Sequence, residues 1–204
     1  MPLALWALMI SAFAVGTTEF VIVGLLPTIA ADLGVSLPSA GLLVSLYALG
    51  VTIGAPVLTA LTGRLPRKTL LLALLVLFIA GNAFAAFAPG YDSLLAARFI
   101  TGLAHGVFFT IASTIATNLV SRDKESSAIA MVFMGLTVAL VTGVPLGTWI
   151  GQVFGWQSTF LGVVALGAVG LIASAVLVPA RLPQSAPPSL RAQAPARRCT
   201  AQPR

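Results

Sequence analysis

Six long apolar stretches fill the first 180 residues and constrain the fold more than any other feature of this chain. They cover approximately residues 4–30, 40–62, 69–88, 93–119, 127–150 and 158–179. A helix needs about 20 mostly apolar residues to cross a hydrocarbon layer about 30 Å thick. Each stretch reaches that length, and breakers such as Pro38, Pro66 and Gly90 lie between them. The sequence therefore predicts an all-α integral membrane domain of six transmembrane helices over residues 1–180.

The composition supports lipid as the solvent of this domain. Hydrophobic residues make up 58% of the chain and charged residues only 8%, whereas a soluble domain carries roughly 25% charged residues. The predicted loops are too short to hold a catalytic site, so an enzyme is not expected. The one cysteine, Cys199, lies in a polar tail and forms neither an internal disulfide nor a metal site. We expect no metal and no cofactor.

The basic residues fall into alternate loops. Lys and Arg occupy the second loop, the fourth loop and the tail: Arg64, Arg67, Lys68, Arg122, Lys124, Arg181, Arg191, Arg197, Arg198 and Arg204. Because short basic loops stay in the cytoplasm, both termini are predicted to be cytoplasmic. The net charge of +6 is spread over loops instead of forming a basic surface stripe, which argues against nucleic acid as a partner. Residues 181–204 are predicted to be a disordered, basic, Pro/Ala-rich cytoplasmic tail.

Three ionisable residues lie well inside the predicted spans: Glu19, Arg98 and His105. A charge near the bilayer centre costs at least about 2.5–3.5 kcal/mol, so each needs a partner or a water-filled cavity. Arg98 and His105 are seven residues apart and therefore share a helix face. The rise of about 1.5 Å per residue places Arg98 about 7 Å, Glu19 about 16 Å and His105 about 18 Å below the outer surface. If the first and fourth helices face each other, Glu19 meets the guanidinium or the imidazole.

The residues alone leave two roles open for the ionisable groups inside the spans. Glu19 either exchanges protons and couples their entry to a change of shape, or forms a static ion pair that holds two helices together. His105 is either a proton carrier or an interface histidine bonded to a neighbouring polar group. Thr18 and Thr110 are the hydroxyl residues that we expect to line a polar pathway beside them.

Small residues recur at every fourth position of the fifth span: Gly135, Ala139, Gly143, Gly147 and Gly151. This spacing forms a continuous groove along one face of a helix, where another helix can pack closely. Pro145 lies within the stripe, removes a backbone hydrogen bond and bends the span. The groove serves either static packing or a hinge, and the pattern does not separate the two.

Several motifs then carry a resemblance to the major facilitator superfamily, in its bacterial drug and sugar efflux branch of arabinose efflux permease-like proton antiporters. The loop Gly63-Arg64-Leu65-Pro66-Arg67-Lys68 is similar to the family's conformational-switch signature, with Gly63 where an aspartate is usual. Arg98, Gly102 and Gly106 lie in a segment that resembles the proton-transfer motif of helix four. Gly143, Pro145 and Gly147 resemble the antiporter motif of helix five. The segments from Gly16 to Pro27 and from Gly155 to Phe160 also look like this branch.

The resemblance implies a fold and an activity. The fold is the N-terminal half of a twelve-helix transporter, made of two three-helix inverted repeats. The activity is alternating-access efflux of drugs or sugars against inward proton flow, in the inner membrane of a bacterium. Because one half is present, the chain is expected to act as a homodimer or with a second six-helix half, or else to be a truncated, transport-inactive fragment. A third alternative is that the chain is a small membrane protein with an interaction role, such as inhibition of a full-length relative.

Overall fold

The computed structural model describes residues 2–62 and 65–180, and this part of the chain is helical with short connections. Six helices in it are long and apolar enough to span a membrane, which confirms the six predicted spans. The elements are α1 (Leu3–Leu33), α2 (Leu37–Thr62), α3 (Arg67–Ala86), α4 (Tyr91–Asn118), η1 (Arg122–Lys124), α5 (Glu125–Val138), η2 (Ala139–Gly143), α6 (Val144–Phe154) and α7 (Trp156–Leu177). The elements η1, α5, η2 and α6 form the fifth span. Arg64 and the predicted tail, residues 181–204, lie outside the described residues.

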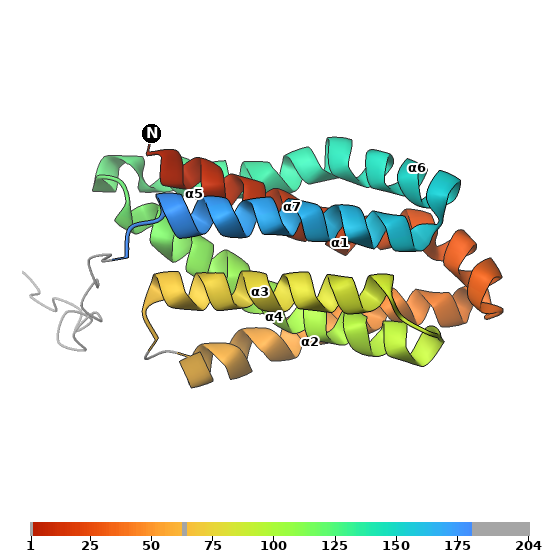
Figure 1. Cartoon of the computed structure of the whole chain (residues 1–204). Coiled ribbons are helices and arrows are strands. Elements are labelled where there is room, and N and C mark those ends of the chain that lie inside the picture. Colours follow the sequence, from red (N-terminus) through yellow and green to blue (C-terminus); the bar gives the residue numbers. More distant parts are fainter. Residues whose placement is uncertain (1, 63–64, 181–204) are drawn as a thin grey trace, which may run out of the picture.

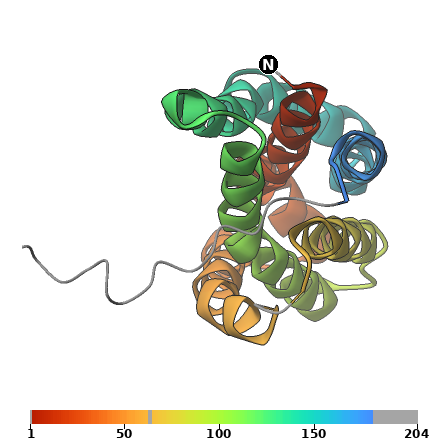
Figure 2. The same cartoon turned by 90° about the vertical axis from the view of Figure 1, so that its left-hand side faces the viewer.

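The helices lie side by side along one long axis and form two groups (Figures 1 and 2). One group joins α2 and α3 to α4, and the other joins α1 to the fifth span and to α7. The first helix of each chain half thus packs with the second and third helices of the other half. This exchange is the arrangement expected of two three-helix repeats, and contacts of α3 with α7 and of α1 with α2 connect the groups.

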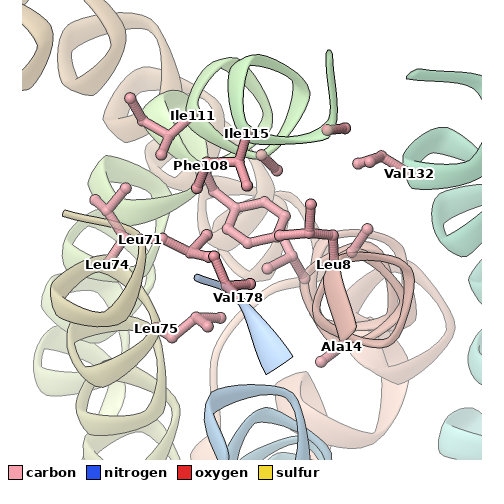
Figure 3. Close-up of a cluster of buried hydrophobic side chains, with 14 of the residues drawn as sticks. Leu8, Ala14, Leu71, Leu74, Leu75, Phe108, Ile111, Ile115, Val132 and Val178 are labelled. Atoms are coloured by element: carbon pink, nitrogen blue, oxygen red, sulfur yellow. The ribbon is translucent and has the colours of Figure 1, made fainter. Parts of the chain in front are cut away.

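A cluster of buried apolar side chains fills the space between α1, α3 and α4 (Figure 3). Leu8 from α1, Leu71 and Leu75 from α3 and Phe108 from α4 meet there, and each is at most 1% exposed. Lipid tails are as apolar as these side chains, so close van der Waals packing, more than exclusion of water, stabilises the cluster. The cluster fixes α1 against α4, the two helices that carry the ionisable residues.

The small residues of the fifth span face α1. A Cβ added to Gly135 would overlap the carbonyl oxygen of Met9 and lie 3.0 Å from the Cβ of Ala12. At the far end, a Cβ added to Gly151 would meet the side chains of Leu25 on α1 and Thr159 on α7. The stripe therefore serves close packing of two helices along most of their length. Whether it also acts as a hinge stays a prediction.

Pro145 follows a distortion of the fifth span. Residues Ala139–Gly143 form a π-helical turn, in which the N–H of Val144 donates to the carbonyl of Ala139. A proline inside a helix has no N–H to donate and its ring collides with the carbonyl four residues earlier. The wider π turn directly before Pro145 accommodates that ring. The structure thus shows a local change of helical pitch before Pro145, and the bend expected of the span stays a prediction.

An indole hydrogen bond joins the end of α1 to the beginning of α7. The Nε1–H of Trp156 donates to Oδ2 of Asp32 over 2.7 Å, and Trp156 is 1% exposed. Trp156→Phe removes the donor and is expected to lower the free energy of unfolding by about 1.5–3 kcal/mol, since hydrogen bonds to charged groups contribute about that much. Titration with a denaturing detergent, followed by circular dichroism, measures the change. Trp149→Phe is the matched control because Trp149 is 56% exposed, and an equal loss in both variants would contradict the prediction.

Candidate proton and substrate site

The carboxylate of Glu19 and the imidazole of His105 meet between α1 and α4. Oε2 of Glu19 lies 3.9 Å from Nδ1 of His105. The side chain of Glu19 is 29% exposed and that of His105 is 11% exposed. Of the two partners expected for Glu19, the structure therefore brings the imidazole closest, and it leaves the carboxylate within reach of solvent or ligand.

Arg98 is sealed within the bundle and bonds to main-chain carbonyls. Its Nη1 donates to the carbonyl of Thr18 over 3.0 Å, and its Nε donates to that of Leu43 over 3.4 Å. The side chain is 1% exposed, and among the described residues it forms no ion pair within 4.0 Å. Arg98 thus ties α4 to α1 and α2 by hydrogen bonds, and its buried charge is stabilised by peptide dipoles.

Tyr47 of α2 completes the group and was not predicted from the sequence. Its hydroxyl lies 2.7 Å from Nδ1 of His105. Its ring stacks under the guanidinium of Arg98, with Cζ of Arg98 4.1 Å from the ring centroid, a favourable cation–π contact. The one signal in the sequence is that Tyr47 is the only aromatic residue of α2.

The two motif glycines of α4 allow α2 to approach. A Cβ at Gly102 would overlap the carbonyl of Tyr47 and lie 3.2 Å from the Cα of Gly50, and one at Gly106 would lie 2.9 Å from the N of Ala55. Any larger residue would separate the helices. The glycines predicted as motif positions therefore bring Tyr47 into the site.

The two predicted threonines occupy different surroundings. Thr18 is fully buried and its hydroxyl donates to Oδ1 of Asn82 on α3 over 2.6 Å. Thr110 lies on the exposed face of α4, and its carbonyl accepts the hydroxyl of Thr114 over 2.8 Å. Thr18 therefore links α1 to α3, whereas Thr110 lies on an exposed face of α4.

An aromatic series leads away from His105. The rings of His105 and Phe109 are 5.2 Å apart, and those of Phe109 and Phe133 stack at 5.1 Å. Phe133, on α5, is 42% exposed. The series thus connects the imidazole that faces Glu19 to an exposed aromatic ring on α5.

Of the predicted switch residues, Arg67 and Lys68 lie within the described part of the chain, in the first turn of α3. Nζ of Lys68 donates to the carbonyl of Ala175 over 2.6 Å, in the last turn of α7. A cation is favourable there because the last carbonyls of a helix carry partial negative charge. Arg67 is exposed. The second loop and the end of α7 therefore lie at the same end of the bundle.

Comparison with known proteins identifies the class of this six-helix domain. Residues 8–201 match the Major Facilitator Superfamily. The MFS-type transporter YtbD of Bacillus subtilis is 55% identical over 190 residues, which cover 93% of this chain and 48% of YtbD. The inner membrane transport protein YdhP of Escherichia coli strain K12 is 45% identical, over 82% of this chain and 43% of YdhP. A chloramphenicol resistance protein of Streptomyces lividans is 42% identical, over 80% of this chain and 42% of its own length.

The chain belongs to the Major Facilitator Superfamily. It spans about half the length of the curated relatives that it matches. A crystal structure of the peptide transporter POT in complex with alafosfalin superposes with a TM-score of 0.78 at 16% identity, over 95% of this chain and 43% of POT. This likeness shows the fold, a six-helix half of the kind found in POT. The six apolar helices and relatives such as the inner membrane transport protein YdhP support a multi-pass inner-membrane protein.

Proposed function

We propose that this chain is the N-terminal half of a proton-coupled exporter of small organic compounds, in which Glu19 carries the proton. The observation that supports it is the pairing of Glu19 with His105, while Arg98 bonds elsewhere. An imidazole forms an ion pair with a carboxylate only when it is protonated. The net charge of this pair therefore depends on its protons, unlike that of a permanent Glu–Arg pair. This property favours a proton carrier over a static helix contact.

The substrate class rests on the site and on the names of relatives. The aromatic series that begins at His105 suits drug-like compounds that carry a flat ring. The matched relatives include the chloramphenicol resistance protein and a probable sugar efflux transporter of Mannheimia succiniciproducens, which is 37% identical over 83% of this chain. Drugs or sugars are therefore the compounds to test first. Thr110 and Phe133 are the residues that we place in contact with them.

The orientation with both termini in the cytoplasm is part of the proposal. The basic residues Lys68, Arg122 and Lys124 lie in alternate connections, which favours one cytoplasmic side. The bond of Lys68 to the last turn of α7 supports a common side for the beginning of α3 and the end of α7. The predicted switching role of Arg67 and Lys68 fits this position.

A second six-helix domain is required by the proposed mechanism, because alternating access moves two halves around a site between them. A second copy of this chain and a separate half both meet that need. Exposed apolar side chains such as Leu49 and Ile53 on α2 and Leu146 on α6 face outward, toward lipid or such a partner.

Reconstitution separates these possibilities. The purified chain is placed in lipid vesicles, alone or together with the C-terminal half of YtbD, and an imposed pH gradient drives labelled chloramphenicol or a monosaccharide. Transport by either assembly supports the proposal, and cross-linking identifies whether a dimer or a pair of halves is active. A monomeric and inactive protein in both assemblies would instead support a transport-inactive fragment.

A further inference from the structure

Two side chains compete for one nitrogen of His105. The hydroxyl of Tyr47 lies 2.7 Å from Nδ1, and Oε2 of Glu19 lies 3.9 Å from the same atom. A ring nitrogen either bears a proton and donates, or lacks one and accepts. Nδ1 therefore cannot accept from Tyr47 while it donates to Glu19.

The hydroxyl of Tyr47 is suited to be the donor of this bond. Tyr47 is 3% exposed, and its hydroxyl has no other hydrogen-bond partner among the described residues. If the hydroxyl accepted a hydrogen bond from an N–H at Nδ1, its own hydrogen would remain buried without an acceptor, which is unfavourable. In the neutral ring the proton then resides on Nε2 and Nδ1 accepts.

The helix spacing keeps Tyr47 in this position. Arg98 lies four residues before Gly102 and His105 lies three after it, so the two side chains flank the place where α2 approaches α4. The carbonyl of Tyr47 packs on Gly102, its ring contacts Arg98 and its hydroxyl contacts His105. A shift of α2 along α4 would break both side-chain contacts together.

We propose that Tyr47 is a positioning residue of the proton site, which holds Nδ1 of His105 as an acceptor until the proton of Glu19 moves to it. The proton leaves the carboxyl oxygen of Glu19 and binds Nδ1, giving a carboxylate and an imidazolium. At that step the hydroxyl of Tyr47 can no longer donate to Nδ1. The ionisable groups that face His105 are Glu19 from α1, Tyr47 from α2 and Arg98 from α4 itself. The inference rests on the proposed proton-carrying role of Glu19.

The chain contains one histidine, so nuclear magnetic resonance of protein labelled with ¹⁵N-histidine reports His105 alone. The protein is purified with a histidine-free affinity tag, placed in lipid nanodiscs and measured at alkaline pH, where an imidazole is neutral. We expect a single tautomer in the unmodified chain, with a bare Nδ1 and a protonated Nε2. In Tyr47→Phe, which keeps the ring under Arg98, we expect this single pattern to be lost and a proton-bearing Nδ1 to appear.

Tyr91→Phe is the matched control. Tyr91 is the other tyrosine of the chain, and its hydroxyl donates to the carbonyl of Ser39 over 2.5 Å, away from His105. This variant is expected to leave the histidine spectrum unchanged. Should Tyr47→Phe fail to fold, incorporation of 3-fluorotyrosine makes the phenol a stronger acid and is expected to shift the Nδ1 resonance, in a Tyr91→Phe background.

An unchanged tautomer in folded Tyr47→Phe, or an unshifted Nδ1 resonance with fluorotyrosine, would overturn the inference. That outcome is distinct from failure of the proposed function. The function fails if Glu19 is dispensable for transport, whatever the histidine spectrum shows, and the positioning role fails on the spectrum alone.

Discussion

Replacement of Glu19 by glutamine is expected to reduce proton-driven export to the level of protein-free vesicles. Glutamine keeps the size and polarity of the side chain but cannot bind or release a proton. His105 then has no carboxyl group from which to receive one, because Arg98 and Tyr47 are the other ionisable groups at this site. Flux of labelled drug under an imposed pH gradient, in the assembly that transports, measures the effect. Insertion and helix content are expected to stay unchanged, since Glu19 forms no ion pair with Arg98 within 4.0 Å in the described structure.

Glu125→Gln is the control for this change. Glu125 begins α5, after the fourth connection, and the same chemical substitution there is expected to leave the flux unaltered. Undiminished transport by Glu19→Gln would remove Glu19 from the mechanism and restore the alternative of a static helix contact.

Substitution of Gly135 by alanine is expected to lower the free energy of unfolding by about 1–3 kcal/mol, the usual cost of overpacking. The added Cβ would meet the carbonyl oxygen of Met9 and the N of Phe13, the latter at 3.0 Å. Both are backbone atoms, so no change of rotamer relieves the collision, and α1 must move away from the fifth span. Detergent titration followed by circular dichroism measures the loss.

Gly162→Ala isolates the effect of position. Gly162 lies inside α7, and an added Cβ there has no neighbour within 4 Å. Alanine is the better helix former by about 0.5–1 kcal/mol, so this variant is expected to be as stable as the unmodified chain or slightly more so. Equal stability of the two variants would show that the small-residue stripe does not require glycine for packing.

The spans and the shared face of Arg98 and His105 follow from rules that act along one helix. The length of an apolar run predicts a span, and a separation of seven residues places two side chains on one face. The small-residue stripe obeys the same rule, and its partner helix, α1, follows once the bundle is known. Such features were predictable because each depends on residues that are near in sequence.

Contacts between different helices could not be predicted from rules that act along one helix. Tyr47 reaches His105 across 58 positions of sequence, and that meeting depends on the register of α2 against α4. The sequence predicted that Arg98 needs a partner but not that two carbonyls would supply it, because a main-chain acceptor has no signature in the side-chain pattern. Thr18 was expected beside a pathway, and its burial against Asn82 follows from the position of α3.

The most direct test of proton-coupled export is exchange in the absence of any imposed pH gradient. Vesicles that contain the chain, alone or with the C-terminal half of YtbD, are loaded with chloramphenicol or a monosaccharide and an internal pH dye, then diluted. If export is coupled to protons, outward movement of the compound draws protons inward and acidifies the vesicle lumen. Glu19→Gln is expected to abolish this acidification. Movement of the compound with no change of internal pH, or no movement in either assembly, would contradict it.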